Sequence, residues 1–201
     1  MIKVLKVAVF LLCLVPFVLL VSGFLTAKLG ANPVEALTHT TGDWILRFLV
    51  ITLSMTPLRR LTGWKAATRF RRMFGLFAFF YGCLHFTIYC ISISNLDFAE
   101  IGTDIAKRPY VTVGFTGFVL MIPLAITSTK KWIVRLGGRR WQMLHRLVYV
   151  SAIAGVLHYL WLVKLDIRFP ARYGIAVAVL LLFRAWTAVH ARHPITQVSG
   201  G

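Results

Sequence analysis

Acidic residues and cysteines are the scarce components of this sequence. Only six of its 201 residues are aspartate or glutamate, and only three are cysteine. Cys13, Cys83 and Cys90 lie singly in apolar stretches, which excludes the spacing of a zinc knuckle or of an extracellular disulfide framework. We interpret them as small buried hydrophobic residues. No acid pair, nucleophile or metal-binding triad is apparent, so we expect the chain alone to perform no substrate chemistry.

The sequence also lacks a polar stretch long enough for a soluble catalytic domain. Hydrophobic residues make up 58% of it, and its mean hydropathy is +0.76. Several apolar runs are long enough to cross ~30 Å of hydrocarbon at ~1.5 Å per helical residue. We therefore predict an all-α, polytopic membrane bundle of six transmembrane helices, forming a single domain over residues 1–201. The predicted spans cover about residues 7–27, 44–60, 73–94, 110–128, 143–163 and 173–189.

The start of the chain fits two interpretations. A basic beginning followed by an apolar run is the pattern of a signal peptide as well as of a first membrane span. The apolar run is longer than the usual apolar region of a signal peptide, which favours a retained span.

The net charge of +17 is distributed unevenly along the chain. With six spans, most lysines and arginines fall in segments on one side of the membrane, and all the acids fall on the other. These acids are Glu35, Asp43, Asp97, Glu100, Asp104 and Asp166. The positive-inside rule makes the basic side cytosolic, so both termini are predicted to be cytoplasmic. This distribution suits an anionic inner leaflet of membrane lipid and argues against nucleic acid as a partner.

Two histidines are predicted to lie deep in spans. His85 comes 13 residues after Arg72, and His158 comes 12 residues after Arg146, each counted from the last basic residue before its span. Both spans run outward, so the two rings are expected at one depth in the outer half of the bilayer. Imidazoles at one depth on neighbouring helices can hold a haem iron between them.

The local sequences around these histidines match. His85 stands in GCLHF and His158 in GVLHY, so each has a glycine three residues before it on the same helix face. A missing side chain there leaves room for a flat macrocycle. The alternative is that the glycines only let helices approach, and that each histidine hydrogen-bonds a neighbour.

A second group of candidates is predicted at the cytosolic end. His145 lies at the start of span five, and the corresponding positions of span three hold arginines rather than histidine. Arginine side chains can bind a phosphate group, and arginine and aromatic side chains can stack on a flat ring. Together they suit flavin mononucleotide (FMN). The alternative is that these arginines only orient the chain. The candidate residues are Arg71, Arg72, Arg139, Arg140 and Trp141.

Two further candidates are predicted at the outer face. His39 precedes span two, and Arg47 lies one turn into it, where either can meet haem propionates. Arg47 can equally extend to water, and Arg184 in span six is expected to extend to the cytosolic surface.

Several motifs together resemble one known family. They are HTTG, FRRMFGL, LHFTIY, KRPYVTVGF, LAITS and GRRWQMLHRLVYVSAIAGVLHYLW. From about residue 10 to 190 the chain resembles the MsrQ (YedZ) family, the haem-binding membrane subunits of the periplasmic protein-methionine-sulfoxide reductase system, within the ferric-reductase-like transmembrane class.

The resemblance implies a b-type haem on His85 and His158, with His145 a further candidate ligand, and FMN on the cytosolic side. It also implies electron transport across the bacterial inner membrane to a periplasmic molybdopterin subunit that reduces methionine sulfoxide in oxidised proteins. In the wider class, two haems use two histidines on each of the third and fifth spans. Here Arg71 or Arg72 stands at the inner position of span three. The sequence therefore fits one haem in the outer half of the membrane, with a flavin or an incompletely ligated haem on the cytosolic side, better than it fits two equivalent haems.

The favoured hypothesis is a transmembrane electron conduit supplied by a quinol or by a cytosolic flavin reductase. One alternative is a metal-ion (ferric) reductase, although the cytosolic dehydrogenase domain usual in that group is not in this sequence. Another is a non-redox transporter or assembly protein whose histidines relay protons or bridge helices.

Overall fold

The computed structural model of this chain describes residues 2–94, 96–163 and 166–190. Within those ranges the chain forms helices and no strand, which confirms the predicted all-α class. Residues 191–201, the last part of the predicted 1–201 domain, lie outside the described residues. In chain order the helices are α1 (Ile2–Leu25), α2 (Pro33–Thr62), α3 (Ala67–Ser94), α4 (Phe98–Lys107), α5 (Pro109–Ile126), α6 (Lys130–Leu136), α7 (Gly138–Leu144), α8 (Leu147–Leu162) and α9 (Arg168–His190).

Each of the six predicted spans falls on a long helix: α1, α2, α3, α5, α8 or α9. In the described residues, five stretches are long and apolar enough to cross a membrane: Ile2–Leu25, Ala67–Ser92, Pro109–Ile126, Gly138–Leu162 and Arg168–His190. The helix α2 is not among them, because charged side chains such as Asp43 and Arg47 interrupt its apolar stretch. At 30 residues it is nevertheless long enough to span a bilayer.

The helix α2 lies among other helices, and its ends are set by local signals. At its start the Asn32 side chain accepts a hydrogen bond from the backbone N–H of Glu35 and donates one to its carboxylate, with Pro33 in the first turn. At its end Gly63 adopts the left-handed conformation, at φ 70°, and its N–H bonds the carbonyl of Arg59. Packing against α3, α8 and α9 covers much of α2, so it needs fewer lipid-facing apolar residues.

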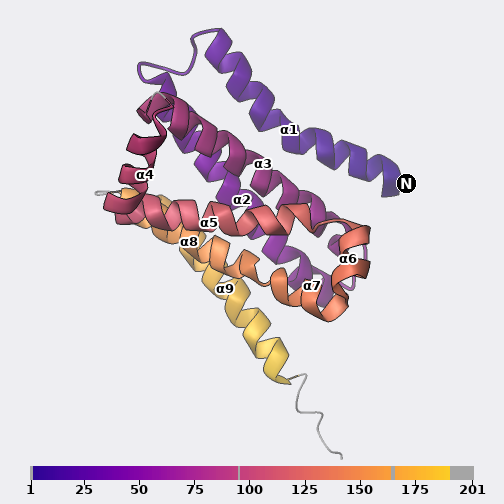
Figure 1. The fold of residues 1–201 in the computed structure, drawn as a ribbon. Coiled ribbons are helices and arrows are strands. Elements are labelled where there is room, and N and C mark those ends of the chain that lie inside the picture. The colour runs from indigo at the N-terminus through magenta and orange to yellow at the C-terminus, as the bar shows by residue number, and fades with distance from the viewer. Residues whose placement is uncertain (1, 95, 164–165, 191–201) are drawn as a thin grey trace, which may run out of the picture.

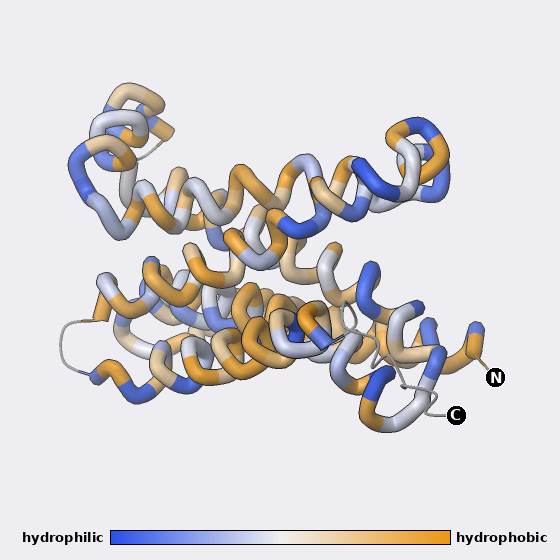
Figure 2. The backbone as a smooth tube through the Cα atoms, turned by 90° about the horizontal axis from the view of Figure 1, so that it is seen from below, coloured by the Kyte–Doolittle hydropathy of each residue, from blue (hydrophilic) through white to orange (hydrophobic). Residues whose placement is uncertain are grey.

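The helices run alternately between two ends of the bundle. Figure 1 shows α4 at one end, and α6 and α7 at the other, together with the start of α1 and the end of α9. The helices α3 and α8 both run towards the α4 end, whereas α2, α5 and α9 run away from it. In Figure 2 the hydrophilic colour gathers mainly at the two ends of the bundle. The α6–α7 end carries a run of basic residues: Lys130, Lys131, Arg135, Arg139 and Arg140.

Aromatic side chains form the core between α2 and α3. Phe48, which is 2% exposed, stacks with its ring centroid 5.6 Å from that of Phe77 and 5.5 Å from that of Tyr81. Tyr81 also donates a hydrogen bond of 3.0 Å to the backbone carbonyl of Cys13, which ties α1 to α3. Buried aromatic rings of this size contribute a large share of packing energy, so the α2–α3 pair forms a rigid base for the site.

A proline in α2 explains the position of Arg184. Pro57 has no N–H, so the carbonyl of Leu53, four residues earlier, lacks its helical donor. The guanidinium of Arg184 supplies one from α9: its Nη2 bonds the Leu53 oxygen at 2.9 Å. Its Nη1 bonds the hydroxyl of Tyr149 on α8 at 2.7 Å. The expectation that Arg184 extends to the surface is therefore wrong, because this side chain satisfies a backbone group inside the bundle.

The structure contains two features that the predicted spans did not include. The outer segment forms a separate amphipathic helix, α4, which begins at the N-cap Asp97 and buries Ile101 against the bundle. Predicted span five, 143–163, is interrupted near its start, because α7 ends at Leu144 and α8 begins at Leu147. His145 thus lies in the turn between two helices rather than within one.

Candidate cofactor site between α3 and α8

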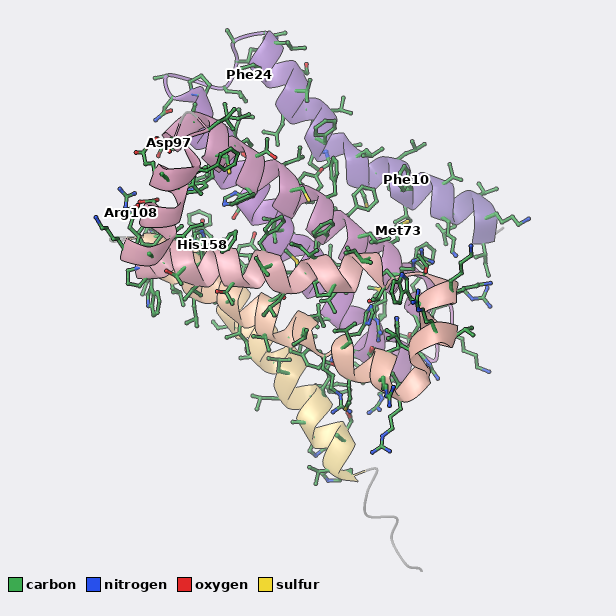
Figure 3. The ribbon with its side chains drawn as sticks, in the orientation of Figure 1. Phe10, Phe24, Met73, Asp97, Arg108 and His158 are labelled. Carbon is green, nitrogen blue, oxygen red and sulfur yellow. The ribbon has the colours of Figure 1, made fainter. Side chains whose placement is uncertain are left out.

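The rings of His85 and His158 lie next to each other inside the bundle. His85 lies on α3 and His158 on α8, and their ring centroids are 6.2 Å apart with planes at 89°. The predicted meeting of these two rings at one depth is thus present in the structure. Figure 3 shows His158 at the α4 end of the bundle, on the same side as Arg108 and far from Met73.

A hydrogen bond to the backbone fixes the orientation of each ring. Nδ1 of His158 lies 2.7 Å from the carbonyl oxygen of Tyr110, and Nδ1 of His85 lies 3.1 Å from that of Thr38. A carbonyl only accepts, so each Nδ1 carries the proton and each Nε2 keeps its lone pair. The Thr41 hydroxyl, 3.2 Å from Nδ1 of His85, gives that ring a second neighbour. Neither Nε2 makes a hydrogen bond within the described ranges.

This arrangement fits two ligands on one iron. Metal-bound histidines usually donate the other ring N–H to a carbonyl or carboxylate, which is the pattern seen at both rings. Metal–imidazole bonds of about 2 Å, with a further ~1 Å from nitrogen to ring centre, separate the two ring centres by about 6 Å. The observed 6.2 Å agrees with that spacing. The residues present therefore fit a bis-histidine haem.

Glycines on neighbouring helices make room for both rings. A Cβ added at Gly114 of α5 would lie 2.5 Å from Nδ1 of His158, and one added at Gly42 of α2 would lie 3.3 Å from Cε1 of His85. Gly82 and Gly155 are the predicted glycines on the histidines' own helices. Both line the cavity around the two rings. A Cβ at either would approach only the side chains of other lining residues.

A large, mostly apolar cavity lies around the two histidines. It holds about 1280 Å³ of empty space, its open mouth included, and is bounded by α2, α3, α4, α5 and α8. Its apolar wall includes Leu46, Leu49, Phe86, Phe115 and Phe118. A wide flat apolar group is the kind of ligand that such a cavity accommodates.

Charged and polar side chains line the outer part of this cavity. His39, Asp43, Asp104 and Arg108 line it. Arg47, predicted as a propionate contact, does not line it. Its guanidinium lies 3.6 Å from the Asp43 carboxylate and bonds the hydroxyl of Tyr173 at 3.2 Å. Sequence reasoning missed Arg108 because its approach to the cavity depends on the fold of α4 against α5.

The predicted inner candidates lie apart from this cavity, towards the α6–α7 end. Trp141 stacks on His145 with ring centroids 3.8 Å apart, and its Nε1 bonds the carbonyl of Thr127. Arg71 comes within electrostatic range of His145. Nε2 of His145 is buried and has no hydrogen-bond partner among the described residues. Three predicted arginines, Arg72, Arg139 and Arg140, are exposed.

Comparisons with known proteins show the class of membrane protein to which this chain is similar. The family model for the ferric reductase like transmembrane component matches residues 8–156, a range that includes His85 and stops just before His158. The features above thus belong to a multi-pass membrane protein of the ferric-reductase-like class.

Three individual relatives show to which family within this class the chain belongs. A protein from Herminiimonas arsenicoxydans is 52% identical over 197 residues, which cover 97% of this chain and 90% of that protein. A protein from Ralstonia nicotianae is 53% identical over 186 residues, which cover 92% of this chain and 86% of that protein. A protein from Rhodospirillum rubrum is 47% identical over 187 residues, which cover 93% of this chain and 90% of that protein. All three carry the name protein-methionine-sulfoxide reductase heme-binding subunit MsrQ. The chain belongs to the MsrQ family, which confirms the resemblance seen in its motifs.

Proposed function

We propose that this chain is the haem-carrying membrane subunit of a protein-methionine-sulfoxide reductase system. In this proposal it transports electrons across the bacterial inner membrane to a periplasmic, molybdopterin-containing reductase, which repairs oxidised proteins. A quinol or a cytosolic flavin reductase supplies the electrons. The observation that carries the proposal is the His85–His158 pair, in which both Nδ1 atoms bond carbonyls and neither Nε2 atom has a hydrogen bond to the described residues.

The proposal includes six membrane crossings with both termini in the cytosol. Its support is the charge distribution: the α6–α7 end is basic, and the α4 end carries Asp97, Glu100 and Asp104. The positive-inside rule then puts the α6–α7 end in the cytosol. The histidine cavity lies towards the other end, so it faces the periplasmic half of the bilayer.

The residues of the site have separate roles in this proposal. His85 and His158 hold the b-type haem, whose iron supplies a carrier for one electron at a time. The carbonyls of Thr38 and Tyr110 keep both rings in the tautomer that binds metal. The apolar wall excludes water, and Gly114 lets the imidazole of His158 occupy its place against α5. No side chain needs to act as an acid, a base or a nucleophile.

For the inner end we propose FMN as the second cofactor. Its support is the group formed by Trp141, His145 and Arg71, which offers an aromatic face, a buried imidazole and a cation. Guanidinium groups bind phosphate well. Acid extraction of the purified protein followed by fluorescence tests this. One flavin per chain is expected, and a second haem per chain without flavin would show that His145 serves a haem instead.

Proteoliposomes test the electron-transport proposal. Purified chain is placed in vesicles that enclose a reduced quinol, with the periplasmic reductase and an oxidised methionine-containing protein outside. We expect sulfoxide reduction with the wild-type chain and with His190→Ala, which changes an exposed histidine at the end of α9. We expect none with His85→Ala or His158→Ala. Equal rates in all four preparations would refute the proposal.

A further inference from the structure

Three side chains close the outer end of the cavity in one connected set. The hydroxyl of Tyr89 on α3 donates to Asp104 of α4 at 2.7 Å. The other oxygen of Asp104 pairs with Nε of Arg108 at 2.7 Å. Asp104 is 12% exposed, whereas the pair partner Arg108 is 53% exposed. A carboxylate that is largely buried and satisfied on both oxygens is held more firmly than an ordinary surface ion pair.

Arg108 connects this set to the start of α5. It ends α4 and immediately precedes α5, its backbone N–H bonds the Asp104 carbonyl, and its carbonyl accepts from the Thr112 N–H. Pro109 follows, and its fixed φ limits how the corner between the helices can bend. Nη1 of Arg108 also reaches the hydroxyl of Tyr110 at 3.4 Å.

The start of α5 orients the imidazole of His158 through a hydrogen bond. The carbonyl that accepts the Nδ1 proton of His158 belongs to Tyr110, two residues beyond Arg108. Tyr89 lies four residues after His85, one turn along the same face of α3. A series of contacts therefore links α3, which carries His85, through α4 to the hydrogen bond that orients His158.

We propose that Asp104 is a positioning residue for His158. Together with Tyr89 and Arg108 it holds the Tyr110 carbonyl where it orients and polarises the imidazole. The hydrogen bond to the far nitrogen of an axial ligand is one of the means by which a protein sets a haem potential. This inference depends on the proposed function, because it assumes that His158 binds haem iron. It goes beyond that function in assigning the α4 helix to the tuning of the site.

The test compares charge-matched variants of the full-length protein in detergent. Asp104→Asn and Arg108→Gln each remove one charge, and the double variant removes the pair. Tyr89→Phe removes a hydrogen bond and no charge. Glu100→Gln is the control, because it removes an exposed carboxylate from the same helix. The readouts are haem per chain, the low-spin ferric electron paramagnetic resonance (EPR) spectrum and the midpoint potential.

We expect Asp104→Asn to keep its haem and to shift the midpoint potential upwards, because a negative charge is lost and the His158 hydrogen bond weakens. Glu100→Gln should shift it less. The double variant decides between positioning and charge alone. Positioning predicts an altered EPR spectrum in the double variant, whereas restoration of both the wild-type spectrum and the wild-type potential would overturn the inference.

Three further outcomes are informative. If Asp104→Asn fails to fold, Tyr89→Phe decides: an altered spectrum supports the inference, and an unchanged one overturns it. Haem binding that survives His158→Ala would refute the proposed function and the inference together. Haem loss in His158→Ala, with no change in any variant of the Tyr89–Asp104–Arg108 set, would refute the inference alone.

Discussion

Gly114 on α5 lies directly against the imidazole of His158 on α8. A Cβ built at Gly114 would be 2.5 Å from Nδ1, 2.8 Å from Cγ and 3.0 Å from Cε1 of that ring. Those distances are shorter than van der Waals contact, so only glycine permits the ring to lie where its Nδ1 bonds the Tyr110 carbonyl. The position of one proposed ligand therefore depends on a residue of a neighbouring helix.

Gly114→Ala is expected to lower the haem content markedly. The added carbon must push His158 aside or separate α5 from α8, and overpacking of this kind typically costs about 1–3 kcal/mol. Gly42→Ala should have a smaller effect, because its Cβ would lie 3.3 Å from Cε1 of His85. The measurement is haem per chain by pyridine haemochrome.

The matched control is Gly102→Ala on α4, where an added Cβ meets nothing within 4 Å. It should keep full haem content, and alanine should stabilise the helix by roughly 0.5–1 kcal/mol. Full haem in Gly114→Ala would show that the ring does not need this close approach.

The contact between Arg184 and the Leu53 carbonyl predicts energetic coupling between α9 and Pro57. Arg184→Met should destabilise the protein by ~1–3 kcal/mol, the typical cost of leaving a buried polar group unpaired. In Pro57→Ala/Arg184→Met the loss should be smaller, because alanine in place of the proline restores the N–H that bonds Leu53. A thermal double-mutant cycle in detergent measures the coupling.

The surface control for this cycle is Arg172→Met, since Arg172 is exposed on the same helix. Its effect should be small and independent of Pro57. Strict additivity of Pro57→Ala and Arg184→Met would mean that Arg184 does not serve the carbonyl that the proline leaves free.

The proposed topology predicts that the two ends of α2 lie on opposite sides of the membrane. Val34 near its start and Leu61 near its end are 40% and 76% exposed, so cysteine at either position should be reachable. In spheroplasts, a membrane-impermeant maleimide should label Val34→Cys at once and Leu61→Cys only after lysis. The unsubstituted chain, with its cysteines inside apolar helices, gives the background. Equal labelling of both positions before lysis would contradict a crossing by α2.

The sequence was sufficient to predict the six long helices and the proximity of the two histidines, for definable physical reasons. Apolar runs, basic segments and the spacing from Arg72 to His85 and from Arg146 to His158 are all encoded locally. Nearly equal spacing on parallel helices predicts nearly equal depth, and the structure places the two ring centroids 6.2 Å apart. The role of these rings as iron ligands stays a prediction.

Features that depend on contacts between helices could not be predicted in the same way. Gly114 and Gly42 matter only because of what faces them, and the glycines that the sequence indicated were those on the histidines' own helices. Arg184 looked like a surface-seeking cation because its acceptor, Leu53, lies on a helix far away in sequence. The Tyr89–Asp104–Arg108 set required α4 to fold across the outer end of the cavity.

The EPR spectrum of the ferric protein reports whether His85 and His158 together ligate the haem iron. The planes of His85 and His158 lie at 89°. If both rings bound one haem iron in these orientations, two of its d orbitals would be nearly equal in energy. The wild-type protein should therefore give a strongly anisotropic low-spin signal. Replacing either histidine by alanine should abolish it, whereas His190→Ala should leave it unchanged. Persistence of that signal in His85→Ala or in His158→Ala would show that these two histidines do not ligate the iron together.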